Sequence, residues 1–359
     1  MAGYKKIGFV VKDMTPPVTG GAIYEDNFRK SGSKDPSLNI EVIPSLRSKN
    51  IFQKILSPLR NLLLCKNLRE YDLICFNSTK YTYFLPLLIL LRMMKKKTMI
   101  IHHHFAAEEF NGLKKIIYGW LENSFLKTAN YVLTPSPYIK SEIKRRVNRD
   151  SLLCLIPFDK IPENHTTNVN PGKLLFIGTV EARKGLIYLV NAMKILKRKG
   201  VQVSLDILGK TIDERYKNEI LNVINEESLD VTFRGYVSKE MMDSIKAESD
   251  IFVFPSLLEG YGMAINEAMA YGLPVITFNN SAMPYSVTDG INGFLIPTGS
   301  SEELAKAIEK VVTDRNLRYA LSQGAIAHAQ SLISQKEFES TVIQLLRTLT
   351  NHSSDIPTC

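Results

Sequence analysis

Residues 251–270 read IFVFPSLLEGYGMAINEAMA, and this one stretch contains the pattern of a buried strand, a glycine-containing turn and the start of a helix. Ile251–Phe254 is a continuous apolar run, as is typical of parallel strands covered on both faces. Gly260 and Gly262 let the backbone approach a ligand closely, and a helix beginning near Met263 would offer free N–H groups and its positive dipole end to a phosphate. The stretch therefore predicts an anion-binding turn at the carboxyl end of a strand.

Two glutamates accompany this turn. Glu259 precedes the glycines, and Glu267 lies eight residues later, inside the expected helix. A separation of eight does not place both on one helical face, so one belongs to the loop and the other to the helix. This spacing suits two different parts of an elongated ligand. The plainer alternative is a helix N-terminus with two incidental acids.

Strand and helix patterns alternate along the whole chain, which predicts parallel sheets covered by helices on both faces. The strand candidates are 7–11, 72–76, 98–101, 131–134, 173–177, 203–208, 231–233, 251–254 and 274–277, and helical patterns include 113–127 and 137–146. Ile161–Gly172 is polar and flanked by prolines, so it is the expected linker. We therefore expect two doubly wound domains, 1–165 and 166–334, and an amphipathic helix in 335–359 that packs back on the first domain. Ligands of such sheets bind beyond the carboxyl ends of the strands, which predicts a functional cleft between the domains.

The composition is that of a globular protein with a basic first half. Of the 359 residues, 45% are hydrophobic and 23% are charged, and the longest apolar run, 81–94, is too short to span a membrane. Residues 1–165 contain 26 Lys and Arg against 14 Asp and Glu, whereas residues 166–359 contain 19 against 22. This asymmetry indicates an anionic partner for the first half, such as a membrane surface, a phosphorylated lipid or nucleic acid. A solvated basic surface is the alternative.

The cysteines give no sign of a disulfide framework or a zinc site. Cys65, Cys75, Cys154 and Cys359 have no paired spacing, and the first residues do not form a signal-peptide pattern. A reducing, cytoplasmic location is therefore expected.

The stretch from Glu259 to Glu267 resembles the E-x7-E signature of the retaining glycosyltransferases of family 4 (glycosyl transferases group 1), which have the GT-B fold of two facing Rossmann-like domains. Other segments resemble family motifs in the expected order: a glycine-rich first loop at 16–22, a Gly…Arg-Lys-Gly loop at 176–185, the segments 233–237 and 247–250, and a G-x-N-G-x-L pattern within 289–296. The resemblance covers nearly the whole chain and is strongest from 174 to 297.

The resemblance implies a site for a nucleotide-sugar donor, either a UDP-sugar or a GDP-sugar. Arg183 and Lys184 would stabilise the departing diphosphate. Glu267 would bind the ribose hydroxyls and Glu259 the hydroxyls of the donor sugar. Many relatives carry an arginine directly after the first glycine of the 176–185 loop, where this chain has Thr179, and this departure places more weight on Arg183. A solvated basic pair is the alternative interpretation of Arg183 and Lys184. The expected binding residues are Gly20, Gly21, Gly178, Arg183, Lys184, Glu259, Gly260, Tyr261, Gly262, Met263, Ala264 and Glu267, and the expected catalytic residues are Glu259, His103, Arg183 and Lys184.

Three consecutive histidines, His102–His104, follow a predicted strand. In the family, a histidine just past this strand contacts the donor sugar, and counting from the strand start makes His103 the best match and His104 the second. A zinc site with Glu108 and Glu109 is the alternative, but adjacent histidines on an extended chain point in alternating directions. No D-x-D motif occurs. Neither a metal nor another cofactor is therefore expected, in agreement with the metal independence usual in this fold.

The resemblance also implies retention of configuration at the anomeric carbon. No carboxylate is clearly placed as a covalent nucleophile, so we expect a front-face substitution in which the leaving phosphate takes the acceptor proton. The expected acceptor is a glycan or a lipid-linked glycan of cell-surface polysaccharide or glycoconjugate synthesis. Basic groups at 95–97, 114–115 and 144–146, together with the apolar run 84–91, suggest peripheral contact with the inner face of an anionic membrane. The alternative is that 84–91 is a helix buried between strands.

Two other functions remain open from the sequence. A sugar-nucleotide epimerase shares this two-domain fold, although the context of Glu259 and Glu267 argues against it. A non-catalytic module that binds membrane or nucleic acid would suit the basic first half. However, no basic motif interleaved with aromatic residues supports nucleic-acid binding.

Overall fold

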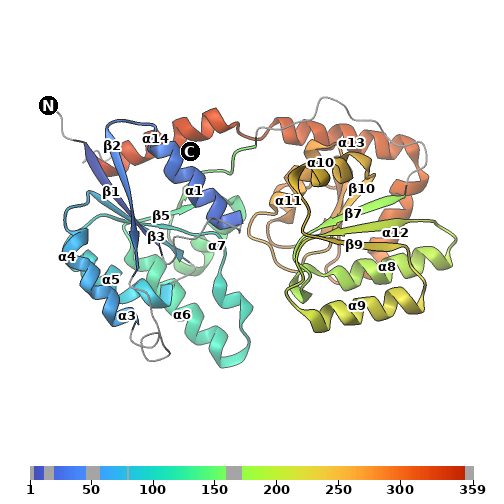
Figure 1. Cartoon of the computed structure of the whole chain (residues 1–359), viewed down its shortest axis with the longest axis horizontal. Helices are drawn as coiled ribbons and strands as arrows, with labels where there is room; N and C mark the ends of the chain where they lie inside the picture. Colours follow the sequence, from blue (N-terminus) through green and yellow to red (C-terminus); the bar gives the residue numbers. More distant parts are fainter. Residues whose placement is uncertain (1–3, 12–19, 46–56, 79–80, 159–171, 352–359) are drawn as a thin grey trace. The chain divides into compact units, whose positions relative to one another are not determined.

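The computed structural model describes residues 4–11, 20–45, 57–78, 81–158 and 172–351 (Figure 1). The chain divides into two compact units: unit 1 consists of Met1–Pro157 with Ile333–Cys359, and unit 2 of Phe158–Leu332. Each unit contains a six-stranded sheet whose neighbouring strands are parallel. The predicted α/β class with two doubly wound halves is therefore confirmed. The expected linker lies outside the described residues except for Gly172.

The sheet of unit 1 has the strand order β2-β1-β3-β4-β5-β6. Its strands are β1 (Lys5–Val11), β2 (Leu38–Pro44), β3 (Leu73–Asn77), β4 (Thr98–Ile101), β5 (Tyr131–Thr134) and β6 (Leu152–Leu153). Its helices are α1 (Gly20–Gly32), α3 (Ser57–Arg60), η1 (Asn61–Leu64), α4 (Cys65–Leu68), α5 (Tyr81–Met93), η3 (Ala106–Glu109), α6 (Gly112–Thr128), α7 (Pro137–Val147) and α14 (Gln335–Thr350). The chain runs from β1 outward to β2 and then crosses to β3 on the other side of β1. The strand order of unit 1 therefore reverses between β1 and β3.

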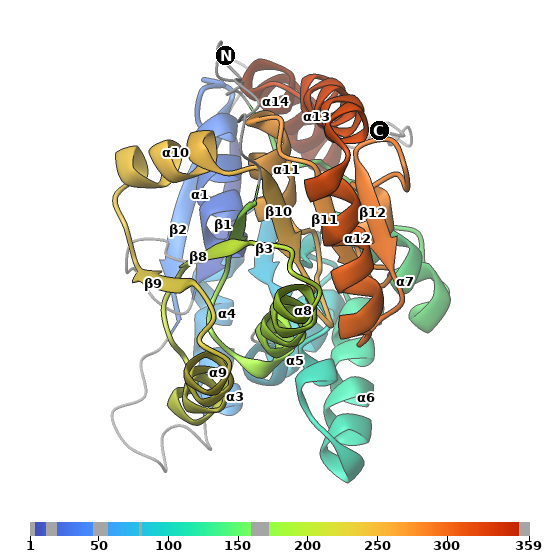
Figure 2. The same cartoon turned by 90° about the vertical axis from the view of Figure 1, so that its right-hand side faces the viewer.

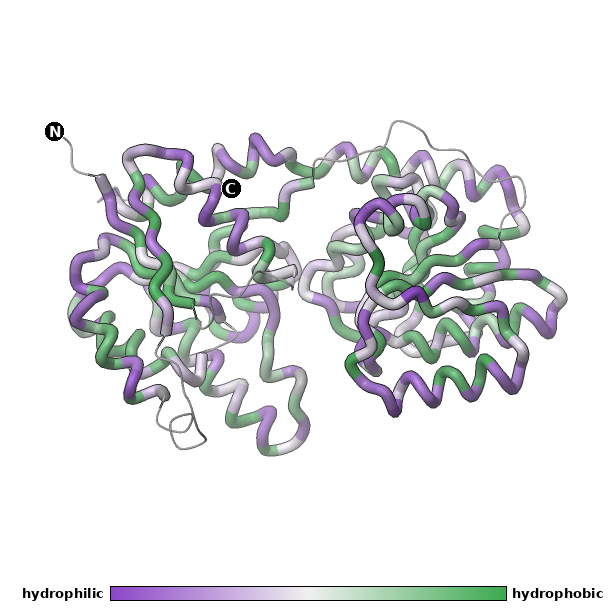
Figure 3. Tube along the Cα trace, viewed as in Figure 1, coloured by the Kyte–Doolittle hydropathy of each residue, from purple (hydrophilic) through white to green (hydrophobic). Residues whose placement is uncertain are grey.

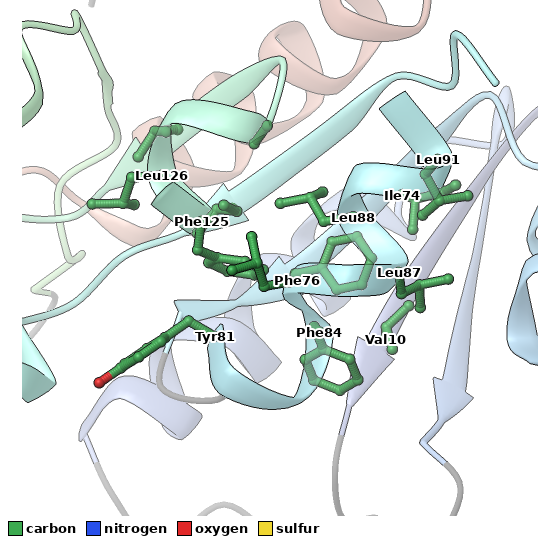
Figure 4. Close-up of a cluster of buried hydrophobic side chains, with 14 of the residues drawn as sticks. Val10, Ile74, Phe76, Tyr81, Phe84, Leu87, Leu88, Leu91, Phe125 and Leu126 are labelled. Carbon is green, nitrogen blue, oxygen red and sulfur yellow. The ribbon is translucent and has the colours of Figure 1, made fainter. Parts of the chain in front are cut away.

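Alternate residues of these strands face two different cores. In β1, Ile7 and Phe9 belong to the core that includes residues of α1 and α14. Val10 belongs to the opposite core with residues of α5 and α6. Figure 4 shows this second core, where Phe76 of β3 lies among Phe84 of α5 and other apolar side chains. Both faces of the sheet are therefore covered, which is why its strands appear as apolar runs in the sequence.

The apolar run 84–91 lies within α5 and is mostly buried. Phe84, Leu85, Leu87, Leu88 and Leu91 are each at most 9% exposed. The interpretation of this run as a helix buried between strands is confirmed. Within the described part of the chain, no helix has both the length and the apolar character needed to cross a membrane.

The last helix, α14, packs within unit 1 although it comes from the end of the chain. Phe338 and Val342 are fully buried in the core that also contains Phe28 of α1. Arg347 Nε donates a 2.6 Å hydrogen bond to Asp35 Oδ2, and this bond lowers the pKa of the Asp35 carboxyl to about 2. Apolar burial and a charged hydrogen bond together hold α14 in this unit.

The sheet of unit 2 has the strand order β12-β11-β10-β7-β8-β9. Its strands are β7 (Lys173–Ile177), β8 (Ser204–Leu208), β9 (Val231–Gly235), β10 (Ile251–Phe254), β11 (Val275–Phe278) and β12 (Gly293–Ile296). Its helices are η4 (Ala182–Lys184), α8 (Leu186–Arg198), α9 (Glu214–Glu226), α10 (Lys239–Glu248), α11 (Met263–Ala270), η5 (Met283–Tyr285), α12 (Ser301–Thr313) and α13 (Arg315–Gln330). The strand order reverses between β7 and β10, so this unit also has a switch point, where ligands of such sheets bind.

The predicted strands are all present, but β2, β6 and β12 were not among them. β2 is a half-exposed edge strand in which Asn39, Glu41 and the terminal Pro44 interrupt the apolar pattern. Figure 3 shows a related contrast within each unit. The central strands are coloured hydrophobic, whereas the colour alternates between hydrophilic and hydrophobic along the outer helices. Sequence patterns thus identified the central strands of both sheets and the edge strand β9, and missed the other three edge strands, β2, β6 and β12.

Candidate functional site

The residues predicted to bind the donor lie in two loops at the switch point of unit 2. One loop follows β7 and runs from Gly178 to Gly185, and the other follows β10 and runs from Pro255 to Gly262. Because β7 and β10 are parallel neighbours, their carboxyl ends lie at the same edge of the sheet. The predicted residues are therefore placed where a ligand of this sheet would bind.

Backbone contacts join the two loops closely. Leu257 N donates a 2.9 Å hydrogen bond to the Arg183 carbonyl, and Ser256 Oγ donates a 3.3 Å bond to the same oxygen. Gly185 adopts a left-handed conformation with φ of 67°, and a Cβ at this position would lie 1.9 Å from the Pro255 carbonyl oxygen. Only glycine allows this approach, which holds the Arg183 backbone against the second loop.

Two cationic side chains of the first loop meet the Glu259 carboxylate of the second. Lys184 Nζ is hydrogen bonded to Glu259 Oε1, and Arg183 Nη1 lies 3.5 Å from the same oxygen. Arg183 Nη1 also donates a 2.9 Å bond to the Leu258 carbonyl, and Ser256 Oγ lies 3.2 Å from Glu259 Oε1. The structure thus brings together three residues that were predicted separately, and it leaves Lys184 largely buried beside them.

Glu181 is a further carboxylate of this cluster that the sequence interpretation missed. Arg183 Nη2 donates a 2.8 Å bond to Glu181 Oε1, and Thr179 Oγ1 donates a 2.6 Å bond to it. The charge of the two cations is therefore balanced by Glu181 and Glu259. A diphosphate would compete with these carboxylates for Arg183 and Lys184. The one signal in the sequence was the position of Glu181, two residues before Arg183 in the same motif.

The helix α11 begins at Met263, as the sequence predicted. Its N-cap residue is Gly262, which has φ of 81° and provides no side chain to cap the first turn. Gly260 and Tyr261 form the loop that precedes it, and Met263 and Ala264 are its first two residues. The positive end of α11 therefore follows directly on the Glu259 cluster, which is the arrangement expected of a phosphate site.

Glu267, one turn further along α11, has a partner that no sequence pattern indicated. Lys246 of α10 donates a 3.1 Å hydrogen bond to Glu267 Oε2, and Lys246 is only 4% exposed. The Lys246 ammonium also lies 5.3 Å from the centroid of the Tyr271 ring. This buried cation fixes one carboxylate oxygen, while a third of the Glu267 side chain remains exposed.

In unit 1, two other predicted residues lie in direct contact. A Cβ at Gly21, in the first turn of α1, would lie 3.2 Å from the His103 ring. His103 Nε2 lies 2.9 Å from Glu25 Oε1, and Asn77 Nδ2 is hydrogen bonded to the same oxygen. Gly20 is the first residue of α1, whereas residues 16–19 of the predicted glycine-rich loop lie outside the described part. His103 is thus paired with Glu25 of α1, and Asn77 of β3 fixes the Glu25 carboxylate. Neither Glu25 nor Asn77 was among the predicted site residues.

The neighbouring histidines differ from His103. His102 is fully buried, its ring lies 4.5 Å from the Phe105 ring, and neither of its ring nitrogens has a hydrogen-bond partner among the described residues. Burial lowers the pKa of His102 well below its usual range, so this histidine is neutral. His104 is half-buried. No group of three or more His, Cys, Asp or Glu side chains in the described ranges is placed to hold a metal ion.

The loop after β4 that carries His103 is anchored by a buried carboxyl. Glu122 of α6 is 1% exposed and accepts hydrogen bonds from Ala106 N at 2.9 Å and Ala107 N at 3.2 Å. Burial raises the pKa of the Glu122 carboxyl to about 7, although the two backbone amides act in the opposite direction.

Unit 1 is therefore expected to lose stability as the pH rises from about 4.5 to about 7. The pKa of Glu122 is raised on folding from 4.5 to about 7. The stabilisation that this carboxyl contributes is therefore fully present below pH 4.5 and is lost as the carboxyl ionises in the folded state. The shift corresponds to roughly 3 kcal/mol. Denaturant unfolding at a series of pH values measures it. Glu122→Gln should flatten this dependence, whereas Glu70→Gln, at an exposed glutamate of unit 1, should preserve it. An unaltered slope in Glu122→Gln would contradict the assignment.

Comparison with known proteins identifies the family of the second unit. Residues 157–328 match the family Glycosyl transferases group 1, and this range covers almost all of unit 2. The match to glycosyl transferases group 1 therefore covers the unit that contains the Glu259 cluster.

Individual relatives agree with this assignment. The chain is 27% identical over 179 residues to the capsular polysaccharide biosynthesis glycosyltransferase CapM of Staphylococcus aureus, covering 50% of this chain and 47% of the relative. It is 26% identical over 257 residues to the O-antigen chain mannosyltransferase B of Escherichia coli, covering 65% and 64%. The matched part spans about half the length of the curated relatives that match first.

The fold is that of known GT-B structures. The structure of Anabaena HepE in complex with UDP and glucose superposes on 96% of this chain and 100% of that one, with a TM-score of 0.74 and 18% identity. At this identity the likeness shows the fold alone.

Proposed function

We propose that this chain, whose second unit matches the glycosyl transferases group 1 family, transfers a sugar from a nucleotide-sugar to a glycan or lipid-linked glycan during the synthesis of a cell-surface polysaccharide. The observation that carries the proposal is the convergence of Arg183 and Lys184 on Glu259 at the switch point of that unit. The relatives of capsule and O-antigen synthesis support the polysaccharide context.

The donor would lie along the two loops and the start of α11. Its diphosphate would replace Glu259 and Glu181 as partner of the two cations and face the first turn of α11. Its ribose would bind Glu267, whose carboxylate is oriented by Lys246. A solved structure of the same fold contains UDP and glucose, which supports a nucleotide-sugar donor. We propose UDP or GDP as its nucleotide. That His103 contacts the donor sugar remains a prediction, as does independence of a metal ion.

Retention of configuration is the stereochemical outcome that we propose. The bond between the anomeric carbon and the diphosphate oxygen would break first, and the acceptor oxygen would arrive on the same face. The acceptor proton would pass to the departing phosphate. Arg183 and Lys184 would stabilise the negative charge that develops on this leaving group. Trapping a glycosyl group on Glu259 or another carboxylate would refute this front-face reaction.

A thermal-shift panel of UDP-, GDP- and ADP-sugars tests the proposal. One nucleotide series should raise the unfolding temperature, because a ligand that binds only the folded state stabilises it. Glu267→Gln should weaken binding of that series about tenfold or more, since hydrogen bonds to a charged group contribute roughly 1.5–3 kcal/mol. Glu219→Gln, at an exposed position of α9 in the same unit, is the matched control and should bind as the wild type does. The absence of any shift with all three series would count against a nucleotide-sugar site.

The rival function is epimerisation of a nucleotide-sugar, which uses the same fold. It predicts an isomerised nucleotide-sugar in reactions without an acceptor. Sugar transfer instead predicts that consumption of the donor depends on an acceptor glycan. Analysis of the products with and without acceptor separates the two functions.

A further inference from the structure

The first half of α6 presents an apolar face that the described residues leave largely exposed. Leu113 is 71% exposed, Ile116 69%, Trp120 67% and Ile117 48%. Their spacing places them on one face of the helix. Every residue from 111 to 117 is exposed, and Figures 1 and 2 show the helix extending away from the sheet of its unit.

This concentration of exposed apolar side chains is peculiar to α6 in the part of the chain that the structure describes. No other described helix or strand carries more than two large exposed hydrophobic residues. Scattered exposed hydrophobics are ordinary, whereas a contiguous group marks an interaction surface. The later turns of α6 are conventional, since Phe125 and Leu126 are fully buried in the core.

The described charges beside this face are positive on balance. Lys114 and Lys115 are exposed between the apolar residues, and the one acidic residue of α6, Glu122, is buried. Glu108, in the preceding η3, is neutralised by Lys115 at 2.5 Å and by Arg146 at 2.7 Å. Two copies of this basic surface would repel each other, which argues against self-association. Apolar residues, a tryptophan and lysines on one short helix suit an anionic lipid surface.

We infer that the exposed face of α6, formed by Leu113, Ile116, Ile117 and Trp120 with Lys114 and Lys115, docks unit 1 on an anionic lipid bilayer. This contact retains Lys114 and Lys115 of the site expected from the sequence but replaces its apolar run 84–91 and the lysines at 95–97. The run 84–91 is buried in α5, and Lys96 and Lys97 donate hydrogen bonds to the backbone carbonyls of Tyr71 and Leu349. The contact is independent of the donor site, so it can fail while the proposed function holds.

The single tryptophan of the chain makes this inference directly measurable, because Trp120 is the only source of tryptophan fluorescence. The full-length protein is mixed with vesicles of phosphatidylcholine alone, or of three parts phosphatidylcholine to one part phosphatidylglycerol. With the anionic vesicles, the protein should sediment at low salt and its emission should move to shorter wavelength. With neutral vesicles both effects should be much smaller, and salt should weaken the anionic binding. Unchanged sedimentation and emission with anionic vesicles at low salt would overturn the inference.

Two matched double variants locate the contact. Leu113→Ser/Ile116→Ser keeps Trp120 as the reporter and should weaken binding to anionic vesicles roughly tenfold or more, through the loss of apolar surface that enters the bilayer. Ile291→Ser/Tyr319→Ser removes two side chains of unit 2 that are 59% and 56% exposed, and should bind as the wild type does. Equal binding by the two variants would refute a role for α6. So would a blue shift that grows with protein concentration without vesicles, because it would show a dimer interface. Thermal shift by the nucleotide-sugar series should be the same in both variants, which separates this test from that of the proposed function.

Discussion

Lys184→Ala is expected to lower the rate of sugar transfer about 100-fold or more. A positioned charge that stabilises a transition state contributes roughly this factor when it is removed from an enclosed site. Lys184 is largely buried, is hydrogen bonded to Glu259 and lies 5.1 Å from the centroid of the Phe254 ring, so its ammonium is held in a fixed position. Steady-state kinetics with the donor identified by thermal shift would measure the loss, which should appear in kcat as well as in kcat/KM.

Lys199→Ala is the matched control for this prediction. Lys199 follows α8, is 43% exposed at its side chain and pairs with Glu309, away from the two loops. Its removal should leave transfer within a few-fold of wild type. Denaturant unfolding should show that both variants remain folded, since Glu259 keeps Arg183 and Ser256 as partners when Lys184 is absent. Lys184→Ala activity within a few-fold of wild type would remove this lysine from the mechanism.

Gly185→Ala should destabilise unit 2 more strongly than any other single change considered for this protein. A left-handed conformation costs a residue with a Cβ about 1–2 kcal/mol, and forcing an atom into a filled space costs about 1–3 kcal/mol more. At Gly185 both costs apply, because the added Cβ would lie 1.9 Å from the Pro255 carbonyl oxygen. We therefore expect the free energy of unfolding of unit 2 to fall by roughly 2–5 kcal/mol.

Gly200→Ala separates the two costs. Gly200 has φ of 79°, and a Cβ there would meet nothing within 4 Å. This control should lose only the conformational part, about 1–2 kcal/mol. Equal losses at the two glycines in denaturant unfolding would show that the two loops do not approach as closely as described. At temperatures where Gly185→Ala remains folded, its donor binding should also weaken, because the displaced loop carries Arg183 and Lys184.

Much of the site was predictable because it depends on local patterns. The strand Ile251–Phe254 and the start of a helix at Met263 follow from an apolar run, a glycine turn and a change of periodicity, and both are confirmed. The same reasoning placed Arg183 and Lys184 after a strand. These features require only neighbouring residues, and their physical causes are local: backbone conformation, helix capping and side-chain alternation.

The partners of these residues were decided by the tertiary structure alone. Lys246 reaches Glu267 from another helix, and Glu25 meets His103 across 78 positions of sequence. The periodicity of a helix shows which residues share a face but not whether another element covers that face. The sequence therefore shows a continuous apolar run in α5 and spaced apolar residues in α6, but only the fold decides that the first is buried and that the start of the second is exposed. The sequence by itself determined the strands, the turn and the charges, while burial and pairing between distant residues depended on how the elements pack.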